Sequence, residues 1–246
     1  MAALVMIGAA VLPALVLLIY FIRSDRFPEP IGGILGTFFL GVLTVIPVLV
    51  YAGPLTAVLL PEAMTPVARA ATEGFILAAL PEEACKLVVL AGFARGLKAF
   101  DEPMDGLVYG VVASLGFATL ENVLYVVGAG DGWFGIALVR ALTAVPAHAT
   151  FGAIMGFYLA RAHFEPERRA LMLLGAFAVP ALLHGLYDLG LLATSYSGDL
   201  AWAPLGLGTL ILAVVWAIRL QRRLRRDQQV LLAAGAAAAI ATAEPR

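Results

Sequence analysis

The sequence predicts an all-α fold, a polytopic membrane bundle of about seven transmembrane helices. The first observation is composition: 62% of the residues are hydrophobic and 13% charged, with a mean hydropathy of +0.95. Soluble domains have about 45–50% apolar and about 25% charged residues. The second is that the apolar residues gather in blocks of roughly 20, the length that crosses a bilayer as a helix. The third is that the basic residues lie between alternate blocks.

The apolar blocks predict the spans in chain order. They are Ala2–Ile22, Ile31–Tyr51, Ala71–Phe93, Asp105–Val127, Trp133–Leu159, Ala170–Leu192 and Ala201–Ile218. No lysine or arginine precedes the first block, and Arg23 follows it. A signal peptide carries its positive charge first, so this block is expected to be a retained span with the N-terminus outside.

The basic residues give the orientation of the other spans. With the N-terminus outside, the inner segments are 23–30, 94–104, 160–169 and 219–229, and they hold twelve of the 16 lysines and arginines, whereas the outer segments hold only Arg69. The positive-inside rule therefore predicts an inner C-terminus. One domain is expected over residues 1–229, followed by an alanine-rich tail, 230–246, that forms a surface helix or is disordered. A net charge of -1 predicts no nucleic-acid partner.

Several ionisable side chains lie inside the predicted spans. Such groups cost about 3 kcal/mol each on insertion scales and mark functional sites. The third to sixth blocks carry, in order, Glu82, Glu83, Lys86, Glu121, Asn122, Arg140, His148, His184 and Asp188. Glu82 lies about 10 residues, or about 15 Å, from the outer end of its helix. Glu121, His148 and His184 lie at a similar level. We therefore expect the group to meet in one polar cavity beneath the outer surface.

Spacing places some of these groups on common helix faces. Lys86 follows Glu82 by four residues and Glu83 by three, so it can compensate one carboxylate. Asp188 follows His184 by four and can orient its imidazole. A lone Glu–Lys pair or a lone histidine in a membrane helix is often only a packing contact, but the combination at one level favours a site. Arg140 is about seven residues from the outer end and is expected to extend to the surface.

Two glutamates and two histidines can activate water in either of two ways. A buried glutamate can take the proton of a water directly, with histidines and Asn122 stabilising the oxyanion. Alternatively, Glu83, Glu121, His148 and His184 can hold Zn²⁺ with one position open for water. The sequence has no His-Glu-x-x-His motif, and spacing alone leaves both mechanisms open.

The ordered motifs resemble those of a known family. Glu82-Glu83-x-x-Lys86, Phe117-x-x-x-Glu121-Asn122, His148 and His184-x-x-x-Asp188 resemble the motif set of the PrsW family of intramembrane proteases. That family is similar to the CAAX prenyl proteases and to the multipass scaffold subunit of gamma-secretase. CAAX proteases usually have Glu-Glu-x-x-x-Arg and place a histidine at the position of Glu121. Both departures favour the PrsW branch.

The resemblance, which covers Pro81 to Asp188, implies an activity and a place. It implies hydrolysis of a peptide bond near the outer leaflet of a bacterial inner (plasma) membrane, in a single-pass substrate such as an anti-sigma factor. It also implies that Glu82 or Glu83 activates water and that His184, with Asp188, binds the water or the oxyanion. Glu121 and His148 would complete the polar or metal-binding shell.

Three other functions fit parts of the pattern. Buried carboxylates and histidines also form the proton relays of ion-coupled transporters, but such transporters commonly show repeated halves, and the sequence shows no internal repeat. A CAAX-type peptidase acting on prenylated proteins would use a similar site. A scaffold or receptor could retain the polar cluster only for assembly.

Overall fold

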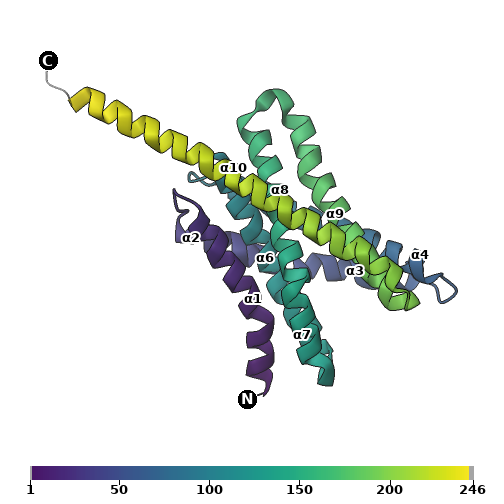
Figure 1. Ribbon diagram of the computed structural model, residues 1–246. Coiled ribbons are helices and arrows are strands. Elements are labelled where there is room, and N and C mark those ends of the chain that lie inside the picture. Colours follow the sequence, from purple (N-terminus) through teal and green to yellow (C-terminus); the bar gives the residue numbers. More distant parts are fainter. Residues whose placement is uncertain (1, 244–246) are drawn as a thin grey trace.

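A computed structural model describes residues 2–243, and every regular element within them is a helix (Figure 1). The elements are α1 (Ala2–Ser24), α2 (Ile31–Leu43), α3 (Val45–Leu59), α4 (Pro66–Ala71), the π-helix η1 (Thr72–Ala79), α5 (Leu80–Gly92), the 3₁₀ turn η2 (Ala94–Gly96), α6 (Pro103–Gly128), η3 (Gly130–Gly132), α7 (Trp133–Leu142), α8 (Ala144–Phe164), η4 (Pro166–Arg168), α9 (Arg169–Ser197), η5 (Leu200–Trp202) and α10 (Ala203–Ala243). The predicted all-α class is confirmed.

Six helical segments of the described chain are long and apolar enough to cross a bilayer. They are Ala3–Ser24, Ile31–Leu59, Pro103–Gly128, Gly130–Phe164, Pro166–Ser197 and Leu200–Ala233. Five of the seven predicted spans lie wholly within them, and a sixth, Ala2–Ile22, lies within them except for its first residue. The remaining prediction, Ala71–Phe93, falls on the continuous helix from α4 through η1 to α5. That helix is long enough to span, but Glu82, Glu83 and Lys86 make it too polar to be counted with the others. Seven spans and the outer N-terminus therefore stay predictions.

Helices α6 and α8 form the centre of the bundle, and glycines let them touch. A Cβ at Gly106 or Gly110 of α6 would clash with a backbone carbonyl oxygen of α8, and a Cβ at Gly152 or Gly156 would clash with one of α6. Small residues four apart allow such close approach in membrane bundles. Gly32, which also begins a small-xxx-small pair in the sequence, has no atom near the position of its Cβ, so that pair does not form a helix contact as a unit.

A π-helix precedes the glutamate pair. Pro81 lacks a backbone N–H, and its ring would crowd the carbonyl four residues earlier in a regular helix. The preceding turns form the wider π-helix η1, at whose end the N–H of Leu80 donates to Phe75 O. Wide turns of this kind are frequent at functional sites. Gly74 and Gly185 allow η1 to lie close against α9, since a Cβ at either would crowd Asp188 or Phe75. This contact brings α5 beside α9.

The last helix extends well beyond the bundle. In Figure 1, α10 crosses the other helices obliquely, and its C-terminal end and the N-terminal end of α1 lie on opposite sides of the molecule. The helix continues through Ala243, so the predicted tail is helical up to that residue. Residues 244–246 lie outside the described part of the chain, and the surface location proposed for the tail stays a prediction.

Candidate active site

Helix α5 places two glutamates and a lysine on the inside of the bundle. Glu83 is fully buried, and Glu82 and Lys86 are buried nearly as completely. Lys86 Nζ donates to Glu83 Oε1 at 2.7 Å and to Glu82 Oε2 at 3.2 Å. The ammonium group also lies 4.3 Å from the centre of the Phe117 ring, within the range of a cation–π contact. One lysine therefore compensates both carboxylates, not one as the spacing suggested.

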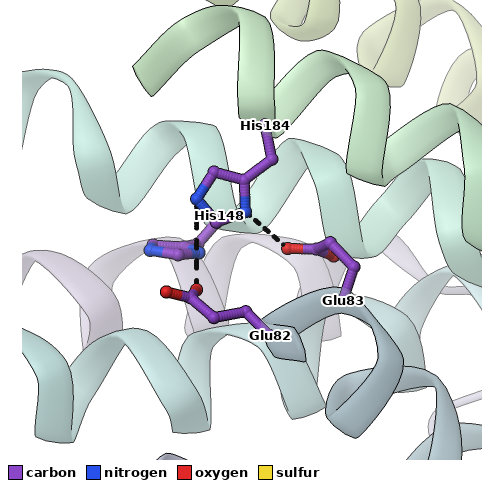
Figure 2. A group of neighbouring side chains, drawn as sticks. All are labelled: Glu82, Glu83, His148 and His184. Atoms are coloured by element: carbon purple, nitrogen blue, oxygen red, sulfur yellow. Dashed lines mark hydrogen bonds and ion pairs between the residues drawn. The ribbon is translucent and has the colours of Figure 1, made fainter. Parts of the chain in front are cut away.

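Helix α9 brings His184 to the same carboxylates, as Figure 2 shows. Its Nδ1 lies 2.9 Å from Glu83 Oε1, and its Nε2 lies 3.2 Å from Asp188 Oδ2 and 4.0 Å from Glu82 Oε2. Both ring nitrogens thus face carboxylate oxygens, which only accept hydrogen bonds. The arrangement favours the doubly protonated ring, which donates on both sides and carries a positive charge.

His148 of α8 joins α5 to α6. Its Nδ1 lies 3.1 Å from Lys86 Nζ, and its Nε2 lies 2.9 Å from Glu121 Oε2. Since the lysine can only donate, Nδ1 accepts, and the ring proton lies on Nε2, where it is donated to Glu121. His148 is therefore neutral in this arrangement. Its ring centre lies 5.3 Å from that of His184, in an edge-to-face contact.

Arg140 of α7 neutralises Glu121, a role that the sequence analysis missed. Its Nη2 donates to Glu121 Oε2 at 2.5 Å, and its Nε donates to Asn122 Oδ1 at 2.6 Å. The guanidinium carbon lies 4.0 Å from the centre of the Tyr125 ring. The expectation that Arg140 extends to the surface is wrong, because the partly buried carboxylate of Glu121 on the neighbouring helix α6 offers it a closer partner. The sequence did hold a signal for this pair, since Glu121 and Arg140 lie in consecutive predicted spans and neither has another oppositely charged partner within its own span.

Asn122 lies to one side of the histidine pair. It is buried, and its Nδ2 donates to the Ala10 carbonyl of α1 at 3.3 Å while its Oδ1 accepts from Arg140. Both polar atoms are thus occupied in holding α1 and α7 against α6. The structure brings the other seven predicted site residues, Glu82, Glu83, Lys86, Glu121, His148, His184 and Asp188, into one connected network.

Four of these side chains could hold a metal ion. Glu82, Glu83, His148 and His184 each offer one ligand atom within 4.8 Å of the others, and Figure 2 shows them converging from α5, α8 and α9. This group contains Glu82 in place of Glu121, which the sequence predicted as a ligand. Glu121 instead accepts a hydrogen bond from His148 Nε2. Carboxylate and imidazole ligands suit Zn²⁺, and Glu83 Oε2 is buried without a hydrogen-bond partner. The donor set therefore fits such an ion.

Lys86 competes with a metal for the same donors. Its ammonium group contacts three of the four side chains, Glu82, Glu83 and His148. A divalent cation and an ammonium group cannot share these contacts, because both are positive and both need the same lone pairs. Metal binding would require Lys86 to withdraw or to lose its proton.

A cavity leads to this network from one end of the bundle. It has a volume of about 660 Å³ and runs between α3, η1, α6 and α7, within the 300–1,000 Å³ typical of ligand pockets. Glu82 and Glu121 line it, and most of its other lining side chains are apolar, such as Val48 and Leu124. Arg69 and Glu73 also line it. The buried charges are thus in contact with a space that can admit water and a peptide segment.

Comparison with known proteins identifies relatives that share most of the chain. Residues 29–220 match a family described as PrsW family intramembrane metalloprotease. Protease PrsW of Geobacillus kaustophilus is 41% identical over 213 residues, covering 86% of this chain and 88% of the relative. Protease PrsW of Bacillus subtilis is 40% identical over 191 residues, covering 77% and 84%. No protein of known structure shows significant similarity.

Paired glutamates and histidines that membrane helices enclose beside a cavity mark a functional site inside the membrane, and the matching relatives are proteases, a class of hydrolase. With these relatives, the chain belongs to the PrsW family of intramembrane proteases. It is accordingly an enzyme, a protease, and a multi-pass protein of the bacterial plasma membrane.

Proposed function

We propose that this protease cleaves a single-pass membrane protein of the anti-sigma-factor type close to the outer leaflet, with Glu82 as the general base. The observation that carries the assignment is the difference between the paired glutamates. Glu82 lines the cavity, whereas Glu83 is fully buried and its Oε1 accepts from both Lys86 and His184. Glu82 is therefore the member of the pair that can meet a water and a substrate.

The network supplies the remaining parts of a hydrolysis. Glu82 takes a proton from a water in the cavity, and the water oxygen forms a bond to the peptide carbonyl carbon. His184, which donates from Nδ1 and Nε2 between Glu83, Asp188 and Glu82, and the Lys86 ammonium are the positive groups nearest to that reaction, so they stabilise the oxyanion. The C–N bond then breaks, and the leaving amine takes the proton that Glu82 received.

Glu83, Glu121 and Asp188 act as positioning residues. Glu83 and Asp188 hold the two nitrogens of His184, and Glu121 holds His148, which in turn accepts from Lys86. Each cation of the site is thereby fixed by at least one carboxylate. Fixed donors aimed at the developing charge are the largest contribution in many hydrolases.

A metal would change the role of this network without changing its members. Zn²⁺ held by Glu82, Glu83, His148 and His184 would polarise the peptide carbonyl and lower the pKa of a bound water. In that form His184 must be neutral to act as a ligand, and Lys86 must leave the donors. Asp188 would then still orient His184 through its second nitrogen.

The placement near the outer leaflet depends on the topology inferred from the basic residues. The cavity is lined by Leu60 at the end of α3 and by Gly128 and Ala129 at the end of α6, which border the predicted outer connections. The cavity therefore opens toward the predicted outer side. A juxtamembrane segment of a single-pass protein would reach Glu82 from there without crossing the bilayer centre.

The test is cleavage of a single-pass substrate in liposomes that contain the purified protease. Glu82→Gln keeps the size of the side chain but removes the base, so cleavage should fall by about 10²- to 10⁴-fold. Glu62→Gln, an exposed residue between α3 and α4, is the matched control and should cleave at the normal rate. Mass spectrometry of the products should place the cut on the outer side. Unchanged cleavage by the Glu82 variant would refute the assignment of the base.

A further inference from the structure

A second group of carboxylates, two buried and two partly buried, lies apart from the candidate active site. Asp25 and Glu29 belong to the connection between α1 and α2, Glu102 is the N-cap of α6, and Asp105 lies in its first turn. One oxygen from each of Asp25, Glu29 and Asp105 lies within 4.8 Å of the others. We call these four residues the α1–α6 carboxylate cluster. It lies at the end of the bundle that the basic residues predict to be cytoplasmic.

No basic side chain neutralises this cluster among the residues whose side chains the structure describes: none of the ion pairs within 4.0 Å includes one of its four carboxylates. The partners that it has are uncharged. The Gln228 amide of α10 donates to Asp25 Oδ1 at 2.6 Å and also to Glu102. Asp105 Oδ2 accepts from the backbone N–H groups of residues 101 and 102. Amide donors offset part of the desolvation, but they leave the like charges facing one another.

Unpaired oxygens point to a missing partner at this place. Asp25 is only 7% exposed, and its Oδ2 has no hydrogen-bond partner. Glu29 Oε2 also has no hydrogen-bond partner. Tyr109 is fully buried, and its hydroxyl lies beside Glu29 and Asp105 without a hydrogen bond of good geometry. Gly33 leaves just enough room for that hydroxyl, since a Cβ there would lie 2.5 Å from it. Buried polar atoms of native proteins are rarely left without a partner.

We propose that Asp25, Glu29 and Asp105 bind a hard divalent cation that joins the α1–α2 connection to the start of α6. The donors are all oxygens, which suits Ca²⁺ or Mg²⁺ and disfavours Zn²⁺, in contrast to the histidine-containing active site. Ligands on opposite sides of Ca²⁺ are about 4.6–5.2 Å apart, and on opposite sides of Mg²⁺ about 4.0–4.2 Å. Because the three oxygens are no more than 4.8 Å apart, they lie within the span of one Ca²⁺ ligand shell, whereas Mg²⁺ would need every pair within about 4.2 Å.

Protons are the other agents that could neutralise the cluster. Burial raises the pKa of the Glu29 and Glu102 carboxyls, and the charge of Asp25 raises both further. Protonation of one carboxyl would remove a charge and supply one O–H donor to a neighbouring carboxylate. A cation would instead neutralise several of the carboxylates at once, so the two explanations differ in what they predict on adding metal at constant pH.

The experiment uses the full-length protein in detergent, stripped with a chelator and then dialysed. Calorimetric titration with CaCl₂, and separately with MgCl₂, should show saturable binding, and thermal unfolding should shift upward by a few degrees at saturation. Asp25→Asn combined with Glu29→Gln keeps the Asp25 Oδ1 acceptor and the side-chain shapes but removes two charges. This variant should lose both the binding heat and the shift, and without metal it should melt at or above the temperature of the unaltered protein.

A matched control separates the site from general charge effects. Glu62→Gln combined with Asp131→Asn removes two exposed carboxylates and should respond to CaCl₂ as the unaltered protein does. Glu83→Gln alters the active site and should also keep the response. An equal shift in the Asp25/Glu29 variant, loss of the shift in Glu83→Gln, or stabilisation by lower pH with no response to either metal would each overturn the proposal. The outcome is independent of cleavage, so it stands or falls apart from the proposed function.

Discussion

The two ends of this molecule bury carboxylates in opposite ways. At the active site, Glu82, Glu83 and Glu121 lie against Lys86 and Arg140, and the histidines bridge them. In the α1–α6 carboxylate cluster the neighbours are amides and backbone N–H groups. The first region carries its own cations, whereas in the second no ion pair is formed among the residues whose side chains the structure describes.

The difference shows how each region can work. Burying an ion-pair network costs desolvation free energy. Several contacts hold each side chain of the network, so its position is fixed, as the proposed catalysis requires. A carboxylate cluster without side-chain cations keeps its charge repulsion until it binds a cation or a proton, so its stability depends on the ion concentration and the pH. We therefore propose that the candidate active site is preorganised, whereas the stability of the α1–α6 carboxylate cluster responds to ions.

The largest effect is expected from removing the cation at the centre of the active site. Lys86→Met keeps most of the side-chain volume but leaves Glu82 and Glu83 buried without their ammonium partner. Loss of one member of a buried pair costs about 3–5 kcal/mol, so the melting temperature in detergent should fall steeply. Lys98→Met, at an exposed lysine, should leave it unchanged.

The same variant decides between the ammonium and a metal. If Lys86 and a metal compete for Glu82, Glu83 and His148, elemental analysis of Lys86→Met should show more bound zinc than the unaltered protein, and zinc should restore part of the lost stability. A Lys86→Met protein that melts normally in the presence of a chelator would contradict the view that the site depends on its own cation.

A smaller effect is expected at the edge of the same network. Arg140→Gln leaves Glu121 without its charged partner, but the Glu121 and Arg140 side chains are 16% and 14% exposed, so water can replace part of the loss. We expect destabilisation by about 2 kcal/mol and slower cleavage, because Glu121 then holds His148 less firmly. Arg140→Lys should recover part of both, since it keeps the charge but not the fork that also reaches Asn122.

An exposed arginine provides the comparison for this measurement. Arg168→Gln, in the turn between α8 and α9, removes one positive charge without touching the network. Equal losses of stability and cleavage rate in the two variants would mean that these losses come from the change in net charge and not from the lost contact with Glu121.

The sequence predicted most of the fold because membrane helices must satisfy every backbone group internally. Apolar blocks of the right length therefore mark the spans, and six of them coincide with long apolar helices of the structure. The segment with Glu82, Glu83 and Lys86 is the exception, since these charged residues, which we propose for the active site, weaken its hydropathy signal. The glycine pairs Gly106/Gly110 and Gly152/Gly156 follow the small-xxx-small pattern that lets membrane helices approach closely.

Side-chain direction was much harder to predict than depth. The level of Glu82, Glu121, His148 and His184 follows from counting residues, but which of them converge depends on helix rotation, and η1 changes that rotation just before Glu82. The group that could hold a metal ion accordingly contains Glu82 and not Glu121. The roles assigned to these residues in catalysis stay predictions.

The α1–α6 carboxylate cluster was missed for a different reason. Its members lie in a connection and at a helix start, where acidic residues are normally solvated or serve as caps. They are enclosed in part because α10 crosses the end of the bundle and places Gln228 against Asp25, about two hundred positions earlier in the chain. No local pattern reports a contact of that range.

The smallest effect expected is also the one that tests the comparison most directly, because it gives the cluster a cation of its own. Gln228 is 2% exposed and already donates to Asp25 and Glu102, so Gln228→Lys places an ammonium group among the carboxylates. We expect stabilisation by about 1 kcal/mol in the absence of divalent ions and loss of the Ca²⁺-dependent shift. Gln228→Met, which lacks both amide and charge, should be destabilised and keep the shift. If the lysine variant responds to Ca²⁺ as strongly as the unaltered protein, the two regions do not differ in the way that their neighbours suggest.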